Sequence, residues 1–100
     1  MQNSKISTKT TNKWNKNRVI SSPFTADRDG LVVVTLSSSD VVYSGASAKL
    51  NGVICCSIGT LSAGNASSLN IPLRANAGDM IEFEANSVGG SASGTFFYNE

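Results

Sequence analysis

The sequence has no histidine, two cysteines, two prolines and no long apolar run. Without histidine, the Ser–His and Cys–His arrangements of nucleophilic catalysis are excluded. The cysteines are the neighbours Cys55 and Cys56, whose direct disulfide would need a strained ring and which make no usual zinc site without histidine. No run of about 18 apolar residues is present, and no apolar segment follows Met1. We therefore expect no enzyme, no cofactor, no metal site, no membrane span and no signal peptide.

Charged residues are also few, at 15% of the chain against the roughly 25% usual in soluble domains. Residues 1–18 carry five basic residues and no acid, whereas residues 19–100 carry three basic residues and seven acids, a net of −4. A basic extended arm over residues 1–18 therefore precedes an acidic body. Such arms contact nucleic acid or an acidic protein surface, although a solvated tail has the same composition. The candidate attachment residues are Lys5, Lys9, Lys13, Trp14, Lys16 and Arg18.

The single tryptophan lies inside this arm. Trp14 is flanked by lysines and could stack on a base or a sugar, but packing against the body or a partner chain is the favoured interpretation. A nucleic-acid-binding surface usually spreads positive charge over the fold as well. Because the body is acidic, a single-strand nucleic acid is disfavoured as the partner.

The body begins with a turn that leads into a β-branched run. Asp27–Gly30 predicts the turn, with Gly30 free to take a positive φ. Leu31–Leu36 is apolar at almost every position, which predicts a strand covered on both faces. The pattern stops over Ser37–Asp40 and resumes at Val41–Ser44.

The strongest local signal is Asn51-Gly52, which predicts a two-residue type I′ hairpin between two apolar runs. The uninterrupted register pairs Leu50 with Val53, Lys49 with Ile54, Ala48 with Cys55 and Ser47 with Cys56. Ala48 and Cys55 then face the core. Ile54 and Cys56 lie on the opposite face and still need cover.

The second half alternates in the same way. Residues 69–75 present Leu69, Ile71, Leu73 and Ala75 on one face, and Pro72 indicates an edge position. Residues 80–85 point Ile81, Phe83 and Ala85 inward, residues 86–94 read as a loop, and residues 95–100 as a last strand. Seven or eight short strands with no helical period predict an all-β fold, a small antiparallel jelly-roll-like β-sandwich over residues 19–100.

The order of the turn motifs adds a resemblance. The segments PFTADRDGLVVVTL, KLNGV, NIPLRANAGDMIEFEAN and GTFFYNE follow one another across Val19–Glu100. This order resembles the small jelly-roll modules at the ends of phage and prophage fibre proteins, which are similar to the trimeric heads of complement and tumour-necrosis-factor-like proteins. The matching positions are Phe24, Ala26, Asp29, Gly30, Asn51, Gly52, Val53, Pro72, Leu73, Ala77, Gly78, Asp79, Phe96, Phe97 and Tyr98.

The resemblance implies a homotrimer on a virion surface. The expected function is that of a non-enzymatic head fibre or capsid-decoration protein, held by the basic arm on the capsid or another virion protein. The candidate subunit-interface residues are Ile54, Cys56, Phe96 and Tyr98. The alternative is a receptor- or glycan-binding tip module of a tail fibre, with stacking candidates Trp14, Tyr43 and Tyr98 and polar loops at 37–40 and 88–94.

Overall fold

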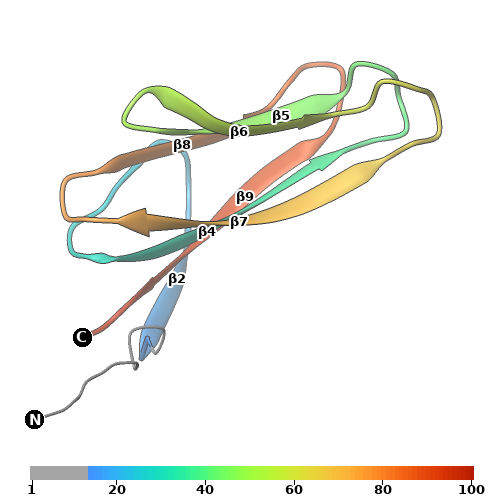
Figure 1. The fold of residues 1–100 in the computed structure, drawn as a ribbon. Helices are drawn as coiled ribbons and strands as arrows, with labels where there is room; N and C mark the ends of the chain where they lie inside the picture. The colour runs from blue at the N-terminus through green and yellow to red at the C-terminus, as the bar shows by residue number, and fades with distance from the viewer. Residues whose placement is uncertain (1–13) are drawn as a thin grey trace, which may run out of the picture.

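Eight β-strands make up the fold in residues 14–100, the part of the chain that the computed structural model describes (Figure 1). The strands are β2 (Lys16–Ile20), β3 (Phe24–Thr25), β4 (Gly30–Ser38), β5 (Gly45–Leu50), β6 (Val53–Gly59), β7 (Ser67–Ala75), β8 (Met80–Ala85) and β9 (Ser91–Tyr98). Over this range, no helix is long and apolar enough to cross a membrane. The predicted all-β class and strand number are confirmed.

The strands form two antiparallel four-stranded sheets in the orders β2-β9-β4-β7 and β3-β8-β5-β6 (Figure 1). The first strand pairs with the last, the second with the second to last, and so on inward, giving β2–β9, β3–β8, β4–β7 and β5–β6. This nesting is that of a jelly roll, in which one long antiparallel ribbon folds over itself into two sheets. The predicted sandwich is therefore confirmed at the level of topology.

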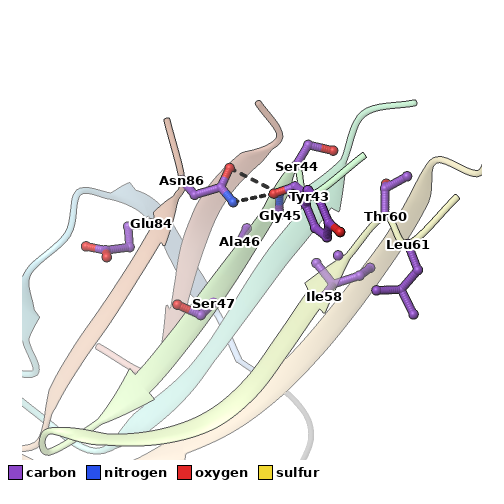
Figure 2. A pocket seen from close by; sticks show the side chains of 11 residues that line it. Tyr43, Ser44, Gly45, Ala46, Ser47, Ile58, Thr60, Leu61, Glu84 and Asn86 are labelled. Carbon is purple, nitrogen blue, oxygen red and sulfur yellow. Dashed lines mark hydrogen bonds between the residues drawn. The ribbon is translucent and has the colours of Figure 1, made fainter. Parts of the chain in front are cut away.

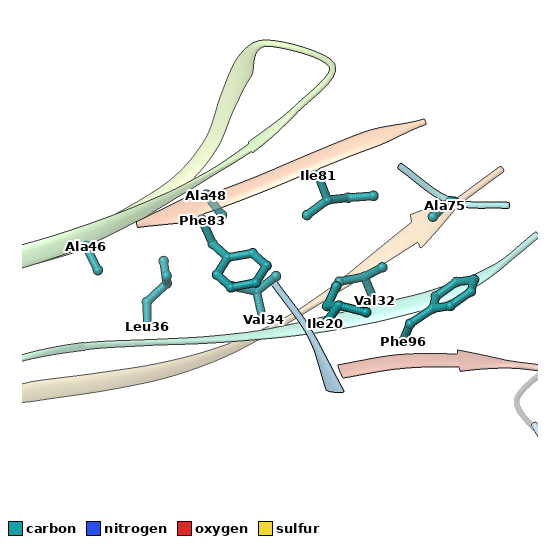
Figure 3. Packing of buried hydrophobic residues seen from close by; sticks show 11 residues of the cluster. Ile20, Val32, Val34, Leu36, Ala46, Ala48, Ala75, Ile81, Phe83 and Phe96 are labelled. Carbon is teal, nitrogen blue, oxygen red and sulfur yellow. The ribbon is translucent and has the colours of Figure 1, made fainter. Parts of the chain in front are cut away.

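The core lies between the sheets and is built by strand alternation (Figure 3). Along β4, Val32, Val34 and Leu36 are fully buried, whereas Leu31 and Val33 on the other face are half-buried. Full burial of such side chains stabilises the fold by roughly 1.5–3 kcal/mol each. One face of β4 is therefore buried as predicted. The other face is only half-buried in this chain, so the prediction of full cover on both faces is not confirmed.

The β5–β6 hairpin has the predicted turn but not the predicted register beyond it. Asn51 has φ 51° and Gly52 has φ 85°, as a type I′ turn requires. Leu50 faces Val53 as expected, but a β-bulge then shifts the ladder so that Ala48 faces Cys56. Cys55 is exposed and Cys56 packs against the core, which reverses the sequence prediction.

Gly30 allows β9 to pack closely against β4, and it does not form a left-handed turn. It begins β4 and is absent from the glycines with positive φ. A Cβ at this position would collide with the carbonyl oxygen of Phe97 and with the ring of Phe96. Gly30 does not use the positive φ that glycine allows; glycine is needed here for the close approach of β9.

The boundary between arm and sandwich lies earlier than residue 18. β2 begins at Lys16 and pairs with β9. Asn15 also joins the body: its backbone N–H donates to Asn99 Oδ1 at 2.9 Å, and its own Oδ1 accepts from the backbone N–H of Glu100 at 2.9 Å. Three predicted arm residues, Lys5, Lys9 and Lys13, lie outside the described residues.

Two further segments differ from the sequence prediction. Residues 41–44 form a turn instead of a strand, and β9 begins at Ser91, inside the predicted loop. The alternation in β7 is confirmed, with Ile71 and Leu73 packed on the core and Pro72 on an edge strand.

Candidate binding surfaces

The end of the sandwich where β2 begins and β9 ends, which we call the terminus end, is closed by aromatic and cationic side chains. The guanidinium carbon of Arg18 lies over the rings of Phe24, Phe96 and Tyr98, at 5.8, 5.6 and 5.4 Å from their centroids. Arg18 also pairs with Asp27 at 3.2 Å. Such cation–π contacts contribute about 0.5–1 kcal/mol at exposed sites. Arg18 therefore acts as a contact of the body and not as a free arm charge.

The Asp27 carboxylate forms ion pairs with both arginines at this end, Arg18 and Arg28. Arg28 lies 3.5 Å from its carboxylate and 4.8 Å over the Tyr98 ring. Burial acts to raise the pKa of Asp27, but the charges of Arg18 and Arg28 outweigh it and hold the pKa below its ordinary value. The Asp27–Gly30 turn is thus a structural ion-pair cluster.

The remaining predicted arm residues in the described range also contact the body. The Arg74 guanidinium lies 5.8 Å over the Trp14 ring, although β2 and β7 are opposite edges of their sheet. Trp14 therefore lies at the outer face of that sheet. Lys16 pairs with Glu100 at 3.8 Å. The Trp14 ring thus contacts the body, one of the two alternatives in the favoured interpretation.

The predicted subunit-interface residues fall into three groups by burial. Phe96 is fully buried, with ring centroids 5.0 Å from Phe24 and 5.2 Å from Tyr98. It has no surface left for a partner, so its assignment to an interface is corrected to the core. Cys56 and Tyr98 are half-buried against that core. Ile54 is 61% exposed and keeps its place as an interface candidate.

Ile54 belongs to an apolar edge strand, which we call the β6 edge (Val53–Gly59). β6 is the last strand of its sheet, and its sequence VICCSIG contains no charged residue. Val53 is 68% exposed, and Cys55 is exposed beside it. Edge strands of monomeric proteins are usually protected by charges or cover, because their free backbone groups pair with other chains. The β6 edge carries a bulge but no charge.

The opposite end of the sandwich is made of three loops held by buried hydroxyl groups. Ser38, Ser44 and Thr60 are buried polar residues. The Thr60 hydroxyl lies 2.7 Å from Ser38 Oγ and 2.5 Å from the carbonyl oxygen of Ser39. The Ser44 hydroxyl donates to the carbonyl oxygen of Val41 at 2.7 Å. This network fixes residues 39–44 against residues 60–66.

Beside these loops lies a hollow of about 360 Å³ on the outer face of the β3-β8-β5-β6 sheet, which we call the loop-end hollow (Figure 2). Its floor includes Gly45 and Gly59, which face each other across β5 and β6. The bulge creates this pairing, because the uninterrupted register would place Ile58 opposite Gly45. In Figure 2, Tyr43 and Leu61 lie on one side, and Glu84 and Asn86 on the other.

Tyr43 is held at the rim of the hollow in an unusual backbone conformation. Its φ is 70°, and its side chain is 73% exposed. The backbone N–H of Tyr43 donates to the carbonyl oxygen of Thr60 at 2.8 Å, and Asn86 Nδ2 donates to the Tyr43 carbonyl oxygen at 2.7 Å. Asn86 Oδ1 also accepts from the N–H of Gly45 at 3.2 Å. These bonds hold residues 43–45 against Thr60 and Asn86 at the rim of the hollow.

The sequence indicated only part of this site. Tyr43 was a stacking candidate, and the expected polar loops at 37–40 and 88–94 lie at the same end. Nothing local marked Gly45, Gly59 or Glu84, because the bulge and the sheet register bring them together.

Neither a metal-binding group in the described residues nor a matching known protein assigns a function to these surfaces. Among residues 14–100, no group of three histidine, cysteine, aspartate or glutamate side chains could hold a metal ion. No protein-family model matches the chain, and no curated protein matches it.

Proposed function

We propose that this protein is a non-enzymatic structural protein of a phage virion, a trimeric head fibre or capsid-decoration module anchored on the virion surface by its N-terminal arm. Because a fold alone does not define a function, the proposal rests on one observation, the uncharged and exposed β6 edge of a jelly-roll sandwich. The order of turn motifs supports the virion assignment.

A closed trimer needs two different surfaces on each subunit, one for each neighbour. The β6 edge supplies the first. The outer face of the β2-β9-β4-β7 sheet supplies the second, where Val19, Val33 and Pro72 share one cross-strand row with Thr95. Val19 is 83% exposed in this row. Packing the β6 edge of one subunit on this row of the next would cover both apolar surfaces.

The uneven distribution of charge along the sequence supports attachment through the first 13 residues. They carry Lys5, Lys9 and Lys13 and no acid, whereas the body is acidic overall. A trimer presents three such arms, so that weak contacts add up through effective concentration. Because exposed charges are screened within about 10 Å at 0.1 M salt, the attachment is expected to be salt-sensitive.

The experiment compares the full chain with residues 14–100 in a co-sedimentation assay on virions that lack the protein. The deletion ends before Trp14 because residues 14–18 belong to the sandwich. We expect the truncated protein to keep its fold and oligomeric state and to lose attachment. A full-length variant with Lys5, Lys9 and Lys13 replaced by glutamine is the matched control and should attach weakly. Undiminished decoration by residues 14–100 would contradict the anchoring role.

A further inference from the structure

We propose that the loop-end hollow binds a neutral pyranose, with the apolar face of the sugar stacked on the ring of Tyr43. This activity is separate from virion attachment and does not depend on it. It uses the face of the sandwich formed by β5, β6 and β8 and the three loops beyond them.

The hollow has the size and the floor of a small-ligand site. Its volume of about 360 Å³ falls within the range of roughly 300–1,000 Å³ typical of ligand pockets. The floor is open because two glycines lie opposite each other. A Cβ on Gly45 would lie 2.5 Å from the carbonyl oxygen of Ile58, so this position excludes every side chain.

Tyr43 is held at the rim in a left-handed backbone conformation that tyrosine disfavours. A bulky residue with φ near +70° is strained, whereas asparagine or glycine accepts this conformation readily. Burial does not explain the choice of tyrosine, because its side chain is 73% exposed. Strained residues persist where the surrounding structure fixes them, and they cluster at ligand sites. Hydrogen bonds from Tyr43 to Thr60 and from Asn86 to Tyr43 supply that fixation here.

The other lining groups match a neutral sugar. An aromatic face is electron-rich and attracts the C–H groups of a pyranose, and Leu61 adds an apolar contact beside it. On the outer face of the sheet, the Glu84 carboxylate and the Ser47 hydroxyl are cross-strand neighbours that can bind sugar hydroxyls. The lining contains no basic residue and one carboxylate, so an anionic sugar would meet repulsion.

The position of the hollow suits a surface that faces away from the virion. Trp14, the first described residue, packs on Arg74, which pairs with Leu31 at the start of β4. The hollow lies at the opposite end of β4, where Thr60 of its lining bonds Ser38, and the nine residues of β4 span about 30 Å. A trimer anchored by its arms would therefore carry three hollows at its far end.

The test is saturation-transfer NMR on the full-length protein with the methyl glycosides of glucose, galactose, mannose, N-acetylglucosamine and N-acetylgalactosamine, and with N-acetylneuraminic acid as the anionic probe. We expect transfer to at least one neutral glycoside and none to N-acetylneuraminic acid. Tyr43→Asn should weaken that signal at least tenfold while melting no lower than the wild type, because asparagine accepts the backbone conformation. Lys16→Met, an exposed change at the opposite end of the sandwich, should bind as the wild type does.

A second variant keeps the proposal open to refutation if Tyr43→Asn fails to fold. A Cβ on Gly59 would lie 3.5 Å from the carbonyl oxygen of Ser44, an ordinary contact, so Gly59→Ala should fold and weaken binding by filling the floor. Absence of transfer to every neutral glycoside would overturn the proposal. So would binding that neither Tyr43→Asn nor Gly59→Ala reduces, or transfer to N-acetylneuraminic acid alone.

Discussion

The two ends of the sandwich are held together by different chemistry. At the terminus end, Arg18 covers Phe24, Phe96 and Tyr98, and the charged contacts lie at the surface. At the loop end, the hydroxyls of Thr60 and Ser44 are buried and bonded to backbone carbonyls. The terminus end therefore depends on aromatic packing, and the loop end depends on hydrogen bonds that have no water to replace them.

This difference gives the two ends different roles. The terminus end closes the core, whereas the loop end holds an exposed side chain in a fixed position. Buried hydrogen bonds are directional, so they can hold an exposed loop in one geometry. Tyr43, strained and exposed, is the residue that this geometry presents. Stacked aromatic rings and ion pairs instead close the core where β2 begins and β9 ends. Four predictions compare the two ends, from the largest expected effect to the smallest.

The largest effect concerns the aromatic core of the terminus end. Phe96→Ala should destabilise the protein by about 3–5 kcal/mol, because it removes a fully buried ring and leaves a cavity between Phe24 and Tyr98. Phe97→Ala, at the half-buried neighbouring position, should cost only about 1 kcal/mol. Urea unfolding of both variants measures the difference. Equal costs would contradict the assignment of Phe96 to the core.

The next effect concerns the buried hydroxyls of the loop end. Thr60→Val keeps the shape of the side chain but removes its hydrogen bonds to Ser38 and Ser39, which should cost about 1–3 kcal/mol. Thr35→Val is the matched control, since its hydroxyl bonds Asn70 where water can replace it, and it should change stability by under about 0.5 kcal/mol. Thermal denaturation reports both values, and a neutral Thr60→Val would show that the network does not hold this end.

A smaller effect separates the two basic residues of β2. Arg18→Met should destabilise by about 1 kcal/mol, because the guanidinium lies over three rings. Lys16→Met should have almost no effect, because it removes one exposed ion pair with Glu100. Chemical denaturation at low and high salt provides the comparison. If Lys16→Met lowers the free energy of unfolding more than Arg18→Met does, Arg18 does not stabilise the fold by packing on the rings.

The smallest effect is a pH dependence at the turn between β7 and β8. The backbone N–H of Asn76, followed by Asn51 Nδ2, holds the pKa of Asp79 below its ordinary value. A lowered folded-state pKa gives stability that is complete above the unfolded pKa of about 3.9 and is lost as the pH falls through the folded value. Asp79→Asn should therefore be slightly destabilised at pH 7 and match the wild type in strong acid. Asp40→Asn serves as the control, and a deficit that persists in strong acid would argue against this account.

Local signals in the sequence predicted the turns and the strand faces. Asn51-Gly52 determined its hairpin because both residues must take positive φ, which few other pairs do. The apolar alternation around Ile71 and Leu73 identified the inner face of β7, because side chains alternate between the faces of a strand.

Features that depend on distant residues could not be predicted. Gly30 is required by Phe96 and Phe97, which are more than sixty positions away along the chain. The bulge at Cys55 places Cys56 against the core, and its one-residue shift puts Gly59 opposite Gly45. The floor of the loop-end hollow follows from that shift alone, so no motif in the sequence marks it.

The most direct test of the trimeric module is the molar mass in solution, measured by size-exclusion chromatography with light scattering on the full chain, on residues 14–100 and on Ile54→Lys. We predict a trimer for the full chain and for residues 14–100, and a folded monomer for Ile54→Lys, because a buried lysine on the β6 edge would lose its hydration. A monomer in all three samples would mean that the β6 edge needs no partner and would contradict the account.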